Sequence, residues 1–286
     1  MGTMRKGYKM KIQLASNYGF CYGVKRAIEI AEEHKDSFTY GPLIHNKDEI
    51  ARLKTGFNIG LVESIEDIKS NSDVVIRTHG IPKNELAILK KQDNKIIDAT
   101  CPYVTTPQNI VERMSKEGYS IVIFGDTKHP EIKGVVSYAE RQNDAFIVLE
   151  PSELENLPLR NKVAVVSQTT KKPEDFAKIV SALVIKHKEV RVFNTICNAT
   201  FENQDAAAEL AKKADVMIVI GGKHSSNTKM LHSISKKDCQ DSYLIENEEE
   251  LNKEWFNSKK LCGVSAGAST PDWIIQNVID KIEAIV

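Results

Sequence analysis

Three of the five cysteines share one local setting. Cys21 lies in YGFCYGV, Cys101 in DATCPYVTT and Cys197 in NTICNAT, each after a strand-like run and before a helical pattern. The amides and dipole of a helix N-terminus stabilise negative charge, which favours a thiolate in each turn. One cysteine so placed is compatible with a disulfide, a nucleophile, a metal ligand or a packed side chain. Three in equivalent turns favour a shared metal centre.

The number and spacing of the cysteines disfavour a disulfide framework and a structural zinc site. Five is an odd number, the chain has no CxxC pair, and its N-terminus has no secretory signal, so a disulfide framework is not expected. Structural zinc needs four closed ligands, and no fourth cysteine completes a set. An iron–sulfur cubane with three cysteine ligands leaves one iron open for a substrate oxygen. We interpret Cys239 as a surface thiol and Cys262 as a small buried side chain.

Histidines and one carboxylate recur in the turns that follow the expected strands. His45 lies in LIHN, His79 in THG and His129 in KHPE. Glu131 is the only carboxylate directly beside a histidine in these turns, and it either complements a helix dipole or relays protons. Thr169 in SQTT is either a helix cap or a substrate contact.

Two turns of small polar residues in the last third of the chain predict an anion site. Ser225, Ser226 and Asn227 form SSN, and Ser269 lies in SAGAST. Helix N-termini bind phosphate through backbone N–H groups and the helix dipole. Ser and Asn are also ordinary helix caps, so either turn alone is weak evidence. Together with the histidines they would supply donors to a phosphate or diphosphate.

The elements that must position these turns follow from the apolar pattern. The runs IVIF (121–124), VAVV (163–166) and VMIVI (216–220) suit parallel strands covered on both faces. Stretches with helical period follow the polar turns, as after Cys21. The alternation of strands and helices predicts an α/β fold with parallel sheets.

The turns also suggest an internal repeat. Nine polar turns sort into three sets of three, each opened by a cysteine turn, and successive cysteines of these turns are 80 and 96 residues apart. We therefore predict three similar α/β lobes with small parallel sheets in a pseudo-threefold, trefoil arrangement. The predicted lobes span residues 10–97, 98–193 and 194–286, and residues 1–9 are interpreted as a leader or vector remnant. Ligands bind beyond the C-terminal ends of parallel strands, so nine turns are expected to meet at one cavity.

Composition excludes several classes of function. The chain has 39 Lys+Arg and 39 Asp+Glu residues, so neither a nucleic-acid partner nor a membrane surface is expected. A membrane span needs about 20 apolar residues, and the longest runs are far shorter. These features indicate a cytoplasmic protein. No GxGxxG turn follows the first expected strand, so direct dinucleotide binding is not predicted.

In combination, the motifs resemble one known family. YGFCYGVKRAIEIA, GPLIHN, RTHGIP, DATCP, HPEIKGV, SQTT, TICNAT, SSNT and GASTPDWII stand in the order found in the LytB (IspH) family, the 4-hydroxy-3-methylbut-2-enyl diphosphate reductases of the non-mevalonate isoprenoid pathway. The resemblance covers nearly the whole chain from Met10. It implies a three-lobed fold around an oxygen-sensitive 4Fe–4S cluster with three cysteine ligands and one open iron.

The resemblance also implies a role for each candidate residue. The residues that match cluster ligands are Cys21, Cys101 and Cys197. Those that match the substrate-pocket histidines are His45, His79 and His129. Those that match the diphosphate site are Ser225, Ser226, Asn227 and Ser269. Glu131 matches the acid that feeds protons to the substrate, and Thr169 matches a contact near the substrate hydroxyl.

The implied reaction is a reductive dehydroxylation that yields isopentenyl and dimethylallyl diphosphate. Two electrons arrive singly from a flavodoxin or ferredoxin system, and the open iron polarises the C–O bond. Glu131 delivers protons, with His129 and Thr169 organising the path. The family expectation for oligomeric state is a monomer.

One departure and two rival classes accompany the resemblance. Many members carry Arg-Gln after CNAT, whereas here Asn203 replaces the positive charge, which affects local salt bridges or a partner-facing surface. A dehydratase on a similar three-cysteine cluster, as in quinolinate synthase, is one rival, and the diphosphate-type turns disfavour it. A cluster-bearing sensor or electron carrier is the other, and it needs neither an open iron nor three cavity histidines.

Overall fold

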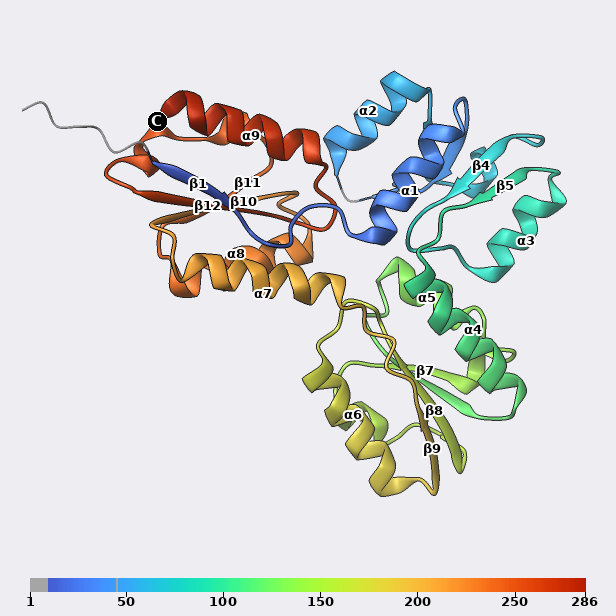
Figure 1. The fold of residues 1–286 in the computed structure, drawn as a ribbon. Helices are drawn as coiled ribbons and strands as arrows, with labels where there is room; N and C mark the ends of the chain where they lie inside the picture. Colours follow the sequence, from blue (N-terminus) through green and yellow to red (C-terminus); the bar gives the residue numbers. More distant parts are fainter. Residues whose placement is uncertain (1–9, 45) are drawn as a thin grey trace, which may run out of the picture. The chain divides into compact units, whose positions relative to one another are not determined.

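Three small parallel sheets organise the chain (Figure 1). The computed structural model describes residues 10–44 and 46–286, and in this part of the chain each sheet has four strands. The chain divides into two compact units. Unit 1 comprises the described parts of Met1–Lys25, Ile44–Ala51 and Asn198–Val286, and unit 2 comprises Arg26–Leu43 and Arg52–Cys197. The predicted α/β class with parallel sheets is confirmed.

Unit 1 is built on one sheet with the strand order β1-β12-β10-β11. Its elements are β1 (Lys11–Leu14), α7 (Ala199–Ala211), β10 (Val216–Ile220), α8 (Ser226–Asp238), β11 (Ser242–Ile245), the 3-10 helices η4 (Glu248–Glu250) and η5 (Lys253–Phe256), β12 (Leu261–Ala266) and α9 (Asp272–Ile285). Helix α9 covers one face of the sheet, and α7 and α8 cover the other (Figure 1). Because all strands are parallel, the turns that follow them lie at one edge.

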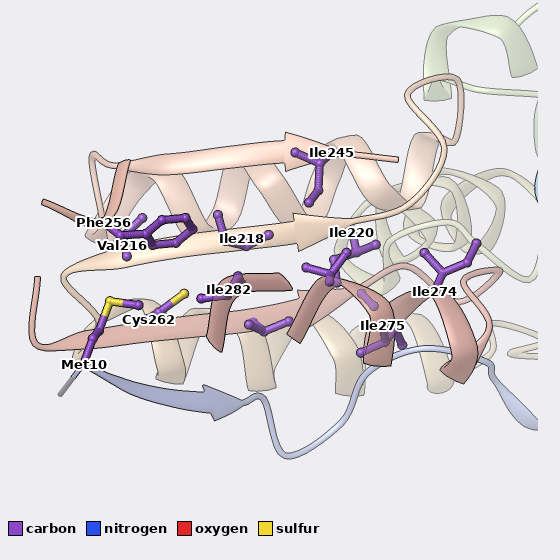
Figure 2. Packing of buried hydrophobic residues seen from close by; sticks show 13 residues of the cluster. Met10, Val216, Ile218, Ile220, Ile245, Phe256, Cys262, Ile274, Ile275 and Ile282 are labelled. Carbon is purple, nitrogen blue, oxygen red and sulfur yellow. The ribbon is translucent and has the colours of Figure 1, made fainter. Parts of the chain in front are cut away.

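Strand β10 shows why this sheet needs helices on both faces. All five of its residues are buried. Val216, Ile218 and Ile220 belong to the cluster that packs against α9 (Figure 2). Met217 and Val219 pack instead with residues of α7 and α8. Because side chains alternate along a strand, the continuous run VMIVI fills two cores at once.

Unit 2 contains two sheets with the strand orders β3-β2-β4-β5 and β7-β6-β8-β9. The elements of the first are β2 (Phe38–Tyr40), β3 (Gly60–Val62), η1 (Ile65–Asp67), β4 (Asp73–Ile76), α3 (Lys83–Lys91) and β5 (Lys95–Asp98). Those of the second are α4 (Pro102–Lys116), β6 (Ser120–Phe124), α5 (Pro130–Val136), η2 (Gln142–Asp144), β7 (Ala145–Val148), η3 (Pro151–Leu154), β8 (Lys162–Ser167), α6 (Pro173–Lys186) and β9 (Glu189–Val192).

Two helices have residues in both units, α1 (Tyr22–Glu33) and α2 (Lys47–Phe57). The helical pattern after Cys21 is confirmed, because Ala27, Ile28 and Ala31 are buried on one face of α1.

No helix in the described residues is long and apolar enough to cross a bilayer.

The strand pairing differs from the predicted grouping of the turns. Strand β1 lies beside β12, with Lys11 opposite Leu261, so it belongs to the sheet of the last lobe and not of the lobe predicted over 10–97. In every sheet the cysteine turn follows an edge strand, namely β1, β5 or β9. Strand β5 pairs with β4 after the short crossover through α3, so Cys101 closes a set of turns that it was predicted to open. Sequence order alone does not specify which sheet an edge strand joins.

Candidate functional site

The three cysteine turns are held by the same hydrogen bond. In each sheet, the cysteine N–H donates to the carbonyl oxygen of the second residue after the neighbouring strand. The pairs are Cys21 to Ala268 at 3.3 Å, Cys101 to Thr78 at 3.0 Å and Cys197 to Thr169 at 2.8 Å. The recurrence of one geometry in three sheets supports the interpretation that the three cysteines are equivalent.

The three thiols are candidate ligands of a metal centre. All three cysteines are half-buried, and none forms a disulfide. Cys101 caps α4 with extended backbone and is followed by Pro102 at the first helical position, where a missing N–H costs nothing. Within the described residues, no three His, Cys, Asp or Glu side chains stand together as a metal site. Each unit by itself holds at most two of the cysteines, because Cys21 lies in unit 1 and the other two lie in unit 2.

A buried carboxyl lies at the start of α5 in unit 2. Glu131 is 1% exposed, and its backbone N–H donates to Nδ1 of His129, the N-cap residue. Its Oε1 accepts from the Thr169 N–H at 2.8 Å, and its Oε2 accepts from the Thr169 hydroxyl at 2.7 Å. The turns after β6 and β8 are therefore joined through one carboxylate.

Burial raises the pKa of Glu131 above its ordinary value, and the two hydrogen bonds from Thr169 offset part of the rise. A carboxyl in this environment keeps its proton at a higher pH than an exposed one. Its position beside a histidine, at the C-terminal edge of a parallel sheet, suits a general acid.

Two of the three predicted histidines lie together in unit 2. The rings of His79 and His129 meet edge to face, with centroids 5.5 Å apart and planes at 85°. They come from the turns after β4 and β6, so the two sheets of unit 2 both contribute to this site. Both side chains are half-buried, which leaves them accessible to a bound molecule. His45 lies outside the described residues.

The predicted anion turn of unit 1 is residues 221–229, at the start of α8. Ser225 is the N-cap residue, and its hydroxyl accepts from the Thr228 N–H at 3.3 Å. Both polar atoms of the Asn227 amide are buried without a partner, as is the Thr228 hydroxyl. Helix N-termini with unsatisfied polar groups bind anions, so this turn suits a phosphate group. The Ser226 side chain lies outside the described part, and Ser269 is half-buried after β12.

Two glycines pack closely against the Thr228 hydroxyl. A Cβ at Gly267 would lie 2.4 Å from this oxygen, and one at Gly221 would lie 2.9 Å from it. Gly221 also has φ +146°, a conformation that L side chains rarely adopt. The turns after β10 and β12 can therefore approach each other only because both carry glycine.

Sequence reasoning missed a second buried carboxyl, in unit 1. Glu49 is 1% exposed, and its Oε2 accepts from the indole N–H of Trp273 at 2.8 Å. The Glu49 N–H donates to the Asn46 side chain, which caps the start of α2. The contact joins the first turn of α2 to the start of α9. Trp273 lies in GASTPDWII and Glu49 lies three residues after GPLIHN, but nothing in the sequence indicates that these two side chains meet.

Two sequence interpretations were wrong. Cys239, expected to be a surface thiol, is 4% exposed and packs with Leu210 and Met217. Asn203, expected to alter a salt bridge or a partner-facing surface, is 6% exposed on the inner face of α7, and its Nδ2 has no partner. Both residues face the sheet because the polar stretches around them form helices whose inner faces are buried.

The comparisons with known proteins all agree on one family. The family model described as "LytB protein" matches residues 12–283. The 4-hydroxy-3-methylbut-2-enyl diphosphate reductase of Sulfurovum sp. (strain NBC37-1) is 75% identical over 276 residues, which is 96% of this chain and 100% of that relative. The sequence-based resemblance is thereby confirmed.

Two solved structures are similar over most of their length. One is that of (E)-4-hydroxy-3-methyl-but-2-enyl diphosphate reductase, "the Terminal Enzyme of the Non-Mevalonate Pathway", with a TM-score of 0.79, 42% identity, and coverage of 96% of this chain and 99% of that one. The other is the E-1-hydroxy-2-methyl-but-2-enyl-4-diphosphate reductase from Plasmodium falciparum, with a TM-score of 0.82, 28% identity, and coverage of 95% and 87%.

Proposed function

Because the chain belongs to the LytB family, we propose that it reductively dehydroxylates 4-hydroxy-3-methylbut-2-enyl diphosphate to isopentenyl and dimethylallyl diphosphate, the last step of the non-mevalonate pathway. The observation that carries this reaction is the acid pair, defined as Glu131 and Thr169. A carboxyl with a raised pKa, fixed by two hydrogen bonds, holds the proton that a leaving hydroxyl requires.

Family membership implies an iron–sulfur-dependent enzyme. We infer a 4Fe–4S cluster whose protein ligands are Cys21, Cys101 and Cys197. When bound, such a cluster supplies electrons and, at the iron without a protein ligand, a Lewis acid for the substrate oxygen. The assignment is supported by the hydrogen bond that all three cysteine turns share.

The remaining candidate residues bind and orient the substrate. The residues inferred to hold the diphosphate are Ser225, Ser226, Asn227 and Ser269, with His45 and His79. Support comes from the buried Asn227 amide, which lacks a partner, and from its place in the first turn of α8. Holding the diphosphate keeps the reacting carbon in one place, which lowers the entropic part of the barrier.

Glu131 delivers the proton in this proposal, and His129 and Thr169 control its orientation. The Thr169 hydroxyl donates to the ionised carboxylate and can accept when Glu131 is protonated, because a hydroxyl does both. His129 fixes the backbone of Glu131 through the N-cap hydrogen bond. The acid therefore keeps one orientation through loss and recovery of its proton.

The electron donor and the setting follow from the family. We infer a one-electron donor protein of the flavodoxin or ferredoxin kind, a cytoplasmic location and a monomeric enzyme. The Glu131 carboxyl supplies protons but no electrons, so an external donor is required for a two-electron reduction.

An anaerobic assay tests the proposal. Protein reconstituted with iron and sulfide is expected to be brown and to consume the hydroxylated diphosphate with reduced methyl viologen as donor. The Cys21/Cys101/Cys197→Ser triple variant should lose the cluster, whereas Cys239→Ser, which changes a cysteine outside the three turns, should keep it. A triple variant with a full cluster contradicts the ligand assignment, and a loaded wild type without turnover contradicts the reaction.

A further inference from the structure

The Cys197 turn differs from the other two in how its chain is attached. Two residues before Cys21 and Cys101, a backbone N–H donates to the carbonyl oxygen of the last residue of the neighbouring strand. These pairs are Gly19 to Ala266 at 3.1 Å and Ala99 to Ile76 at 3.1 Å. Both turns therefore continue the strand pairing with backbone atoms alone.

At the equivalent place before Cys197, a side-chain hydroxyl makes this hydrogen bond in place of the backbone N–H. The Thr195 hydroxyl donates to the Ser167 carbonyl oxygen at 2.6 Å and accepts from the Ser167 N–H at 2.8 Å. Thr195 is 7% exposed, so water does not compete for these groups. One hydroxyl thus satisfies both backbone groups of the last residue of β8.

This hydroxyl lies at one end of a short path of hydrogen bonds and consecutive residues. Two residues beyond Ser167, Thr169 accepts from the Cys197 N–H and donates twice to Glu131. The path joins Thr195 to the cysteine and to the carboxyl through neighbouring residues of one turn. Loss of the hydroxyl would leave the Ser167 backbone unpartnered and free the chain between Phe193 and Cys197.

We propose that Thr195 is a positioning residue whose hydroxyl fixes the Cys197 turn against the acid pair. The inference deepens the proposed function and rests on it for the catalytic effect alone. It applies to this turn only, because the other two cysteine turns make the equivalent hydrogen bond with a backbone N–H and not with a side chain. Both hydrogen bonds of the Thr195 hydroxyl are made with Ser167, so in this proposal Thr195 acts through Ser167 and Thr169.

Three variants separate positioning from general stability. Thr195→Val keeps the shape and removes the hydroxyl, whereas Thr195→Ser keeps the hydroxyl. Thr39→Val is the matched control, since Thr39 is 4% exposed and its hydroxyl donates to Gly60 in another sheet. Each is purified anaerobically and measured by hydrogen–deuterium exchange, cluster content and steady-state kinetics.

In Thr195→Val, peptides covering residues 193–198 are expected to exchange at least about fivefold faster, with no change in residues 98–102. We expect kcat to fall about 10- to 100-fold with KM within about twofold, because the acid pair moves relative to the Cys197 turn. Thr195→Ser should show the wild-type exchange rate in residues 193–198 and the wild-type kcat. Thr39→Val should leave this exchange rate and kcat unchanged.

Wild-type exchange in Thr195→Val would overturn the inference, as would faster exchange with unchanged kcat. Failure of Thr195→Ser to restore exchange would also overturn it, because the hydroxyl would then not be the cause. If the loaded wild type has no turnover, the proposed function fails, and the exchange of residues 193–198 by itself decides whether Thr195 positions the turn.

Discussion

The acid pair of unit 2 and the anion turn of unit 1 differ in whether their buried polar side-chain atoms have hydrogen-bond partners. In the acid pair, both oxygens of Glu131 accept from Thr169. In the anion turn, the Asn227 amide and the Thr228 hydroxyl are buried without partners. In the part of the chain that the structure describes, the other side chains with such atoms also lie in unit 1, namely Asn203, Ser235 and Ser265.

The difference is consistent with the role that we propose for each region. A proton donor needs one fixed environment before substrate arrives, because its pKa and orientation set the transfer. An anion site gains affinity when its polar groups make their hydrogen bonds only with the ligand. A buried polar atom without a partner costs about 1–3 kcal/mol, so unit 1 is less stable without a ligand or ordered water at these positions.

The largest expected effect is that of removing the acid. Glu131→Gln keeps the shape and an acceptor oxygen but cannot deliver a proton. Turnover should fall about 10²- to 10⁴-fold, while KM changes little. The control is Glu112→Gln, which removes a carboxylate paired with Lys83 and Lys116 on the surface of the same unit. Anaerobic kinetics check this, and wild-type turnover in Glu131→Gln would remove it from the proton path.

The next effect concerns the unpartnered amide. Asn227→Ala should weaken binding of inorganic diphosphate about 10-fold or more, measured by calorimetry, because a charged ligand loses a hydrogen bond. Folding stability should not fall, since no internal hydrogen bond is lost and two buried unpartnered atoms are removed. Asn247→Ala is the contrast: it removes the cap that accepts from the Glu249 N–H and should cost about 1 kcal/mol. Equal diphosphate affinity in both variants would contradict the role of Asn227.

A third effect is the pH dependence of stability from Glu131. Its raised pKa means that the folded chain binds this proton more tightly than the unfolded chain does. The stabilisation is complete below the ordinary value of 4.5 and is lost as pH rises through the raised pKa. Urea unfolding of wild type and Glu131→Gln should therefore show wild type losing stability relative to the variant above about pH 5. A relative gain with rising pH would mean that the carboxylate is stabilised by its surroundings.

The smallest effect tests the cost of an unpartnered hydroxyl. Thr228→Val replaces a fully buried hydroxyl with a methyl group of similar size. Thermal unfolding should show a gain of up to about 1 kcal/mol. In Thr270→Val the hydroxyl that donates to the Ile220 carbonyl oxygen is removed, and stability should fall instead. A loss of stability in both would indicate that ordered water satisfies Thr228.

Part of the site could be read from the sequence because it is local. The Cys101 turn, the HPE stretch with His129 and Glu131, and the SSN turn each lie within a few residues of a helix start, where local chemistry predicts a role for each. Their neighbours could not be read in this way. Thr169 is 38 residues from Glu131 along the chain, and Trp273 is 224 residues from Glu49.

The sequence by itself determined the α/β class, the parallel strands, the cysteine turns at helix starts and the family. Each of these depends on the period of apolar residues or on a motif of a few consecutive residues. Only the tertiary structure decided that β1 joins β12, that Asn203 and Cys239 face inward, and that the Thr195 hydroxyl replaces a backbone hydrogen bond. These features depend on which edges and faces meet, and strand pairing between distant segments leaves no period or spacing in the chain.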